Sequence, residues 1–168
     1  NGIKFLREDS TFFHKSDCEK LFNLADNFNA PATYPTEKGM LWEEKNAIYK
    51  HTVSCSSLQC IDLNKIRSKK FKVVVDAVNG AGALALPTML DMLGCEVIKL
   101  DCEPNGVFNR GTEPLPENLK TLSQNVIQNN ADVGFAVDPD ADRLAVVDVN
   151  GTPLGEEYSL VLAADGYI

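Results

Sequence analysis

From Lys70 onward, the sequence alternates short apolar runs with stretches in which apolar residues recur at helical spacing. A short apolar run bounded by turn residues is typical of a buried strand, and helical spacing is typical of a helix packed on one face. The strands predicted in this way are 71–78, 95–101, 131–138 and 144–151, and the predicted helices are 83–94 and 116–130. Strands that alternate with helices predict an α/β layered fold.

The last two of these strands are joined only by a tight loop, 139–143. So short a connection predicts that the two strands are antiparallel neighbours, because parallel neighbours need a long crossover. We therefore expect a three-layer α/β domain with a mixed, mainly parallel sheet. A further helix is expected to begin in 155–168.

The chain before Lys70 has a separate set of predicted elements. Residues 1–5 alternate between apolar and polar in the manner of a strand. Residues 16–28 have the apolar spacing of a helix, and Ser16 and Glu19 have the spacing of a capping box at its start.

Two further segments suggest where one domain ends and the next begins. Residues 29–39 are rich in helix breakers and predict a loop, and 42–68 predicts one or two helices that lead into the next domain. We predict a partial first α/β domain at 1–45 and the domain with the mixed sheet at 46–168. Because a strand-like pattern is already under way at the first residue, and a helical one is unfinished at the last, we expect a piece of a longer protein.

Composition and charge narrow the class of partner. The 168 residues are 44% hydrophobic and 24% charged, with a formal net charge of -8. An acidic balance argues against binding to nucleic acid or to an anionic membrane surface, although a local positive site could still hold an anionic substrate. No apolar stretch is long enough to span a membrane, and no signal peptide is visible. Five cysteines without paired spacing fit neither a disulfide framework nor a zinc site, so we expect reduced thiols and a cytoplasmic protein.

The most distinctive chemistry is an acidic loop between the last two predicted strands. Asp138, Asp140 and Asp142 occupy alternate positions, and Arg143 follows directly. Three carboxylates this close repel one another unless a cation lies between them. Oxygen ligands suit Mg²⁺, Mn²⁺ or Ca²⁺, and an arginine suits a phosphate bound to the same metal.

Two other interpretations of the acidic loop compete with this one. Alternating aspartates also open an EF-hand, but here Arg143 stands where that loop needs glycine, Val149 stands where it needs glutamate, and strands replace the flanking helices. We therefore reject the EF-hand. A solvated acidic turn is the plainer alternative, and the arginine and the two apolar strands around the aspartates weigh against it.

A glycine-rich turn suggests a rival function. Gly80, Gly82 and Ala85 have the spacing of a dinucleotide-binding turn after a strand, and Asp101 lies where a ribose-binding acid is expected. The alternative is a turn in which the glycines only allow the helix to pack closely on the sheet. The nicotinamide-binding interpretation would leave the three aspartates unexplained.

Several segments together resemble one family. Residues 135–143 ("FAVDPDADR") resemble the metal-binding loop of the alpha-D-phosphohexomutases, and 73–82 ("VVVDAVNGAG") resemble the start of that family's second domain. Residues 103–119 resemble the loop and helix between its second and third strands, and 1–5 ("NGIKF") resemble the strand after its catalytic phosphoserine loop. The resemblance covers nearly the whole chain and keeps the family's order. Phosphoglucomutases, phosphomannomutases and phosphoglucosamine mutases are members.

The resemblance implies a mechanism and roles for residues of this chain. An enzyme phosphoserine would exchange its phosphoryl group with a hexose phosphate through a bisphosphate intermediate, moving phosphate between the 1- and 6-positions. Mg²⁺ would be held by Asp138, Asp140 and Asp142, and Arg143 would contact the transferring phosphate. Lys4 would lie beside the phosphoserine as a charge partner or proton donor, although a solvated lysine at a strand edge is the alternative.

The resemblance also implies what is missing. Residues 1–45 would be the C-terminal part of the family's first domain, and 46–168 would be its second, so the serine loop and the sugar-binding domains are expected outside this chain. We therefore expect the isolated chain to be inactive, with the remaining mutase domains and a hexose phosphate as its partners. A nicotinamide-binding module and a non-catalytic phosphosugar-binding module on a mutase scaffold stay open as alternatives.

Overall fold

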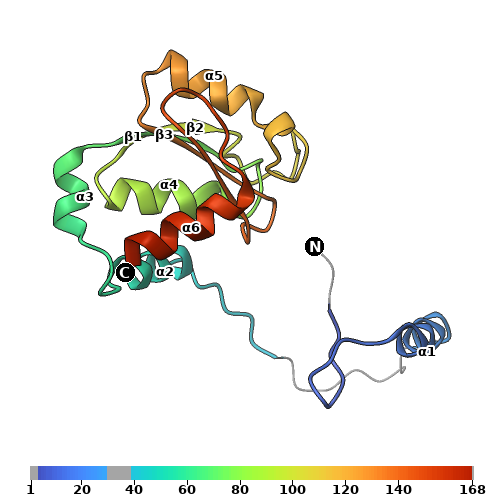
Figure 1. Ribbon diagram of the computed structural model, residues 1–168. Coiled ribbons are helices and arrows are strands. Elements are labelled where there is room, and N and C mark those ends of the chain that lie inside the picture. The colour runs from blue at the N-terminus through green and yellow to red at the C-terminus, as the bar shows by residue number, and fades with distance from the viewer. Residues whose placement is uncertain (1–3, 30–38, 168) are drawn as a thin grey trace. The chain divides into compact units, whose positions relative to one another are not determined.

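A computed structural model of the chain describes residues 4–29 and 39–167. The chain divides into two compact units, Asn1–Glu43 and Glu44–Ile168, each of which is described by itself (Figure 1). Among the described residues, no helix combines the length and the apolar character that crossing a bilayer requires.

In its described part the first unit contains one helix, α1 (Lys15–Asp26), at the place that the apolar spacing predicted. The expected capping at Ser16 is wrong, because the helix begins at Lys15 and its N-cap is His14, two residues earlier. The Asp17 carboxylate accepts the His14 main-chain N–H at 3.2 Å, so an acidic residue in the first turn satisfies the backbone there.

The strand expected over residues 1–5 is not formed where the structure describes it. Residues 1–3 and most of the expected 29–39 loop lie outside the described residues, and Lys4 and Phe5 belong to no strand. Leu6 makes only an isolated antiparallel bridge with Phe12. A strand needs a continuous hydrogen-bonded neighbour, and this unit supplies a single bridge within its described part.

The second unit contains the elements predicted from the alternating pattern. They are α2 (Ala47–Ser56), α3 (Leu63–Lys69), β1 (Lys72–Asp76), α4 (Gly82–Met92), β2 (Glu96–Leu100), the short 3₁₀ helix η1 (Pro116–Asn118), α5 (Lys120–Gln128), β3 (Val133–Val137), β4 (Leu144–Val147) and α6 (Glu156–Tyr167). The single helix expected over 116–130 is divided, because Pro116 opens a 3₁₀ turn and the α-helix begins only at Lys120.

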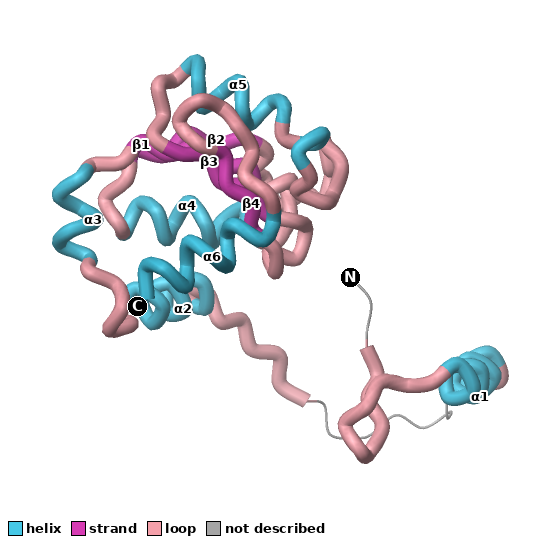
Figure 2. The backbone as a smooth tube through the Cα atoms, in the orientation of Figure 1, coloured by secondary structure: helices cyan, strands magenta, loops and turns pink. Residues whose placement is uncertain are grey.

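The sheet is mixed, as predicted. Its strand order is β2-β1-β3-β4, with β1 parallel to both of its neighbours and β4 antiparallel to β3. Figure 2 shows the strands gathered between α5 and α4. Helix α5 covers one face, where Leu122 and Val126 pack against Val74 and Ala136. Helices α4 and α6 lie over the opposite face, where Leu90 joins the core (Figure 1). These three layers confirm the expected α/β fold.

The parallel register brings three loops to one edge of the sheet. Asp76, the last residue of β1, pairs with Leu100 on one side and with Ala136 on the other. The segments that follow β1, β2 and β3 therefore all leave the sheet at its carboxyl edge, where ligands bind in open α/β sheets. The acidic loop is the third of these segments.

Candidate metal centre

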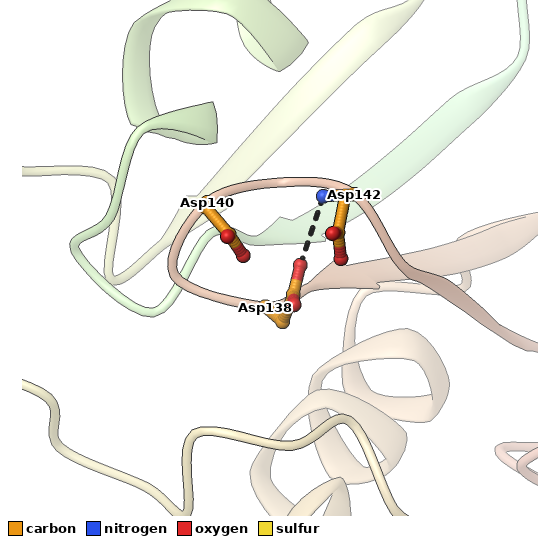
Figure 3. A group of neighbouring side chains, drawn as sticks. All are labelled: Asp138, Asp140 and Asp142. Carbon is orange, nitrogen blue, oxygen red and sulfur yellow. Dashed lines mark hydrogen bonds between the residues drawn. The ribbon is translucent and has the colours of Figure 1, made fainter. Parts of the chain in front are cut away.

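The three aspartates of the acidic loop lie together at the carboxyl end of β3. Asp138, Asp140 and Asp142 each place a carboxylate oxygen within 4.8 Å of the others (Figure 3). Asp138 is only 5% exposed, whereas the other two are exposed to solvent. A cation between these oxygens would contact one buried carboxylate and two exposed carboxylates. Water or a phosphate could also reach the cation from the exposed side.

Asp138 also shapes the loop around itself. Its Oδ1 accepts the main-chain N–H of Asp142 at 3.0 Å and that of Arg143 at 3.1 Å. Its main-chain carbonyl accepts the N–H of Ala141 at 3.1 Å, and Ala141 has a left-handed φ of 60°. The chain thus folds back over the Asp138 carboxylate, and Oδ2 takes part in neither amide bond.

The glycine-rich turn packs directly against the acidic loop. The Ala81 main-chain N–H donates to the carbonyl of Pro139 at 2.8 Å. A Cβ added at Gly80 would lie 2.5 Å from that same Pro139 oxygen, so only glycine allows this approach. The space that Gly80 leaves is filled by the acidic loop. A Cβ at Gly82, the first residue of α4, would lie 2.8 Å from Cγ2 of Val137 in β3, which supports close packing of the helix on the sheet over the dinucleotide-binding interpretation.

Asn79 connects this turn to the long segment after β2. Its Nδ2 donates to the carbonyl of Val107 at 2.9 Å, and its Oδ1 accepts the N–H of Glu103 at 3.0 Å. Asn79 and the preceding Val78 have left-handed φ values of 55° and 46°. This conformation is costly for a β-branched residue, so the surrounding contacts must hold it in place.

Arg110 is the residue at this edge that sequence reasoning missed. Its guanidinium donates from Nε to Oδ2 of Asp76 at 2.8 Å and from Nη2 to the carbonyl of Val137 at 2.7 Å. The Arg110 and Asp76 side chains are 9% and 3% exposed. The available signal was Asp76 itself, because an acid that ends a buried strand requires a polar partner.

Arg143 has its guanidinium turned to Glu113, with which it forms an ion pair. Both side chains are about half exposed, and Glu113 was also missed from the sequence. Lys4 is an exposed residue of the first unit, so the structure places it in a different unit from the aspartates and Arg143. His14 and His51 are both exposed.

Comparison with known proteins decides which family this site belongs to. Residues 49–151 match the family model described as "Phosphoglucomutase/phosphomannomutase, alpha/beta/alpha domain II". The chain belongs to this family. The match includes both the glycine-rich turn and the acidic loop, so the resemblance seen in the sequence is confirmed and the nicotinamide-binding alternative is set aside.

Relatives of this phosphoglucomutase/phosphomannomutase family chain are considerably longer. A probable phosphoglucosamine mutase of Pyrococcus horikoshii is 46% identical over 169 residues, which cover 100% of this chain and 36% of that protein. A probable phosphoglucosamine mutase of Methanopyrus kandleri is 34% identical over 165 residues, covering 96% of this chain and 35% of that protein. The chain thus spans about a third of the length of these relatives.

A solved structure supports the same assignment. A phosphoglucomutase/phosphomannomutase family protein from Burkholderia thailandensis matches with a TM-score of 0.52 and 31% identity. The match covers 61% of this chain and 24% of that one.

Proposed function

We propose that this chain supplies the metal-binding part of a Mg²⁺-dependent phosphohexomutase. The complete enzyme would move a phosphoryl group between the 1- and 6-positions of a hexose phosphate, by way of an enzyme phosphoserine and a bisphosphate intermediate. The observation that carries the proposal is the convergence of three carboxylates within 4.8 Å, in a chain of this family. In this proposal residues 1–45 are the C-terminal part of the first mutase domain, and 46–168 are the second.

The donor set at the acidic loop fits Mg²⁺. All three candidate ligands, Asp138, Asp140 and Asp142, offer charged oxygen atoms, which this hard cation prefers. The exposure of Asp140 and Asp142 leaves space for water and for a phosphate oxygen, which Mg²⁺ commonly keeps among its ligands. Bound there, Mg²⁺ would stabilise negative charge on the phosphoryl group during its transfer.

The residues of this chain would orient the reacting phosphate. The Asp142 and Arg143 amides fix one oxygen of Asp138, so the loop presents its carboxylates in a set arrangement. The Arg143 guanidinium would leave Glu113 and bind a phosphate oxygen. Because the ion pair with Glu113 is half exposed, breaking it would cost little free energy. Lys4 would serve the phosphoserine as a charge partner or proton donor.

The remaining parts of the proposal concern the whole protein. The phosphoserine and the sugar-binding domains would be supplied by segments outside these 168 residues. We accordingly propose that the isolated chain is inactive, that a hexose phosphate and the other mutase domains are its partners, and that the protein is cytoplasmic. Its acidic composition supports the absence of nucleic-acid and membrane partners.

Calorimetric titration of Mg²⁺ into the isolated chain tests the metal site. The wild-type chain should bind Mg²⁺, and a variant with asparagine at all three positions, 138, 140 and 142, should not. Equal binding by the two proteins would overturn the assignment of the loop.

A chimera tests the mutase activity. Residues 44–168 would replace the matching segment of the Pyrococcus horikoshii relative, whose own activity is measured first. The chimera should interconvert hexose phosphates in Mg²⁺, and the same chimera with the three asparagines should not. A chimera that folds and binds Mg²⁺ without turnover would favour the non-catalytic phosphosugar-binding module.

A further inference from the structure

Arg110 connects two strands at the edge of the sheet that carries the acidic loop. Its Nε contacts Asp76, the last residue of β1, and its Nη2 contacts the carbonyl of Val137, the last residue of β3. Val137 directly precedes Asp138, the buried member of the aspartate group. One guanidinium therefore fixes the point at which the acidic loop leaves the sheet.

The planar guanidinium makes this connection rigid. Nε and Nη2 lie on one fork, so the Asp76 carboxylate and the Val137 carbonyl are held at a set separation. The side chains of Arg110 and Asp76 are almost fully buried, and removing one partner of a buried ion pair leaves the other uncompensated. A lysine could keep the charge, but its single ammonium lacks the fork that serves both acceptors.

Arg110 is itself held in place by its own loop. Its Nη1 donates to the carbonyl of Gly111 at 2.9 Å. A Cβ at Gly111 would lie 2.3 Å from Nδ2 of Asn118, which donates to the carbonyl of Glu113 at 2.9 Å. The segment that follows Arg110 is thus packed against the 3₁₀ helix η1, and its Gly111 carbonyl holds the guanidinium that also contacts Val137.

We propose that Arg110 is a positioning residue that sets the place of Asp138 and thereby the affinity of the acidic loop for a divalent cation. The proposal rests on the proposed function for its metal readout. The hydrogen bonds of Arg110 go to Asp76, Val137 and its own loop and to none of the three aspartates, so it acts through the Val137 carbonyl and the strand end that precedes Asp138. Groups that support metal ligands in this way typically change affinity by about 10- to 100-fold when they are replaced.

The test compares Arg110→Lys with the wild-type 168-residue chain, using Mn²⁺ as the probe. Free and bound Mn²⁺ are distinguished by electron paramagnetic resonance, and thermal unfolding is recorded for both proteins. Arg110→Lys should bind Mn²⁺ at least about tenfold more weakly. A lower melting temperature with unchanged Mn²⁺ affinity would show a purely structural role and would overturn the proposal.

A matched control is available at the opposite end of the unit. Arg67, like Arg110, uses Nε and Nη2 as donors. In Arg67 both atoms donate to a single main-chain carbonyl, that of Met92, at 3.0 Å and 2.7 Å. Arg67→Lys removes the same fork far from the carboxyl edge of the sheet. It should leave Mn²⁺ affinity unchanged, and an equal loss in both variants would overturn the proposal.

A second measurement needs no metal and separates this inference from the proposed function. The Asp142 and Arg143 amides donate to Asp138, so their hydrogen exchange reports the position of that carboxylate. In Arg110→Lys these two amides should exchange at least about tenfold faster, while the Val126 amide in the core stays protected. If the wild-type chain does not bind Mn²⁺, the proposed metal site is wrong. The hydrogen exchange of the two amides in the wild type and in Arg110→Lys then decides by itself whether Arg110 positions Asp138.

A second variant covers the case in which Arg110→Lys does not fold. Asp76→Asn keeps the shape of the side chain that accepts the Val78 N–H at 2.9 Å but weakens its contact with Arg110. Asp76→Asn should weaken Mn²⁺ binding and speed the hydrogen exchange of the Asp142 and Arg143 amides, each by a smaller factor than Arg110→Lys does. Wild-type values for both quantities in a folded Asp76→Asn protein would overturn the proposal.

Discussion

The main-chain N–H of Arg143 donates to Oδ1 of Asp138 at 3.1 Å, while the Arg143 side chain pairs with Glu113. The backbone of Arg143 is therefore part of the acidic loop, and its guanidinium reaches to the segment after β2. Asp138 has a corresponding double role, because its buried carboxylate is both a candidate ligand and the acceptor that closes the loop. Substitution of the exposed Asp140 should therefore affect metal binding alone, whereas a change that displaces Asp138 should affect both metal binding and folding.

Asp140→Asn should weaken Mg²⁺ binding without reducing stability. Asp140 is exposed, and its replacement removes one of three charged ligands. Surface substitutions of this kind usually change the free energy of unfolding by no more than about 0.5 kcal/mol. Calorimetry should show a higher Kd for Mg²⁺, and urea unfolding should show an unchanged midpoint.

Asp91→Asn is the matched control for this variant. It removes the same charge from an exposed position on α4 and should leave the Kd unchanged. If Asp140→Asn binds Mg²⁺ as tightly as Asp91→Asn, Asp140 is not a ligand.

Gly80→Ala should destabilise the second unit and also weaken Mg²⁺ binding. The new Cβ would lie 2.5 Å from the Pro139 carbonyl oxygen, and the contacting atom is backbone that cannot rotate away. Forcing extra volume into such a contact typically costs about 1–3 kcal/mol. We expect a lower urea midpoint together with weaker Mg²⁺ binding, because the displaced residue lies between Asp138 and Asp140.

Gly166→Ala provides the comparison for Gly80→Ala. Nothing lies within 4 Å of a Cβ at Gly166, which is on α6. Alanine is the better helix former there, so this variant should be neutral or slightly more stable. If the two variants have equal urea midpoints, the acidic loop moves to accommodate Gly80→Ala without a loss of stability.

The sequence predicted the acidic loop well because the relevant signals are local. Apolar runs on each side of Asp138–Arg143 indicated two strands, and the short connection indicated that they are antiparallel, which the structure confirms. The same reasoning missed Arg110, since its contact with Asp76 joins residues 34 positions apart and depends on the path of an irregular loop. The strand expected at residues 1–5 failed in its described part for a related reason, because a strand pattern does not specify the neighbouring strand.

Glu113→Gln should strengthen the binding of inorganic phosphate to the Mg²⁺-loaded chain. The ion pair with Glu113 occupies the Arg143 guanidinium, and removing the carboxylate charge frees that group for an anion. Because both side chains are about half exposed, the free energy of unfolding should change by less than about 1 kcal/mol. Calorimetric titration of phosphate measures the affinity directly.

Two further variants make the Glu113 result specific. Glu117→Gln makes the same charge change at an exposed position nearby and should leave phosphate affinity unchanged. Arg143→Gln should reduce phosphate affinity. An equal gain in Glu117→Gln would indicate a general effect of net charge and would contradict the role given to the Glu113–Arg143 pair.

Asp148→Asn should lower stability at neutral pH but not in acid. The pKa of Asp148 lies below its ordinary value, chiefly because its carboxylate accepts the Thr152 main-chain N–H at 2.8 Å, with a further contribution from Asn150. A lowered pKa in the folded state means that the ionised carboxylate stabilises the fold. This contribution is complete above about pH 4 and is lost as the pH falls through the lower folded-state pKa. In metal-free buffer, the melting temperature of Asp148→Asn should therefore lie below that of the wild type at neutral pH, and the difference should shrink by about pH 3. A difference that stays constant across this range would show that ionisation of the Asp148 carboxylate does not stabilise the turn after β4.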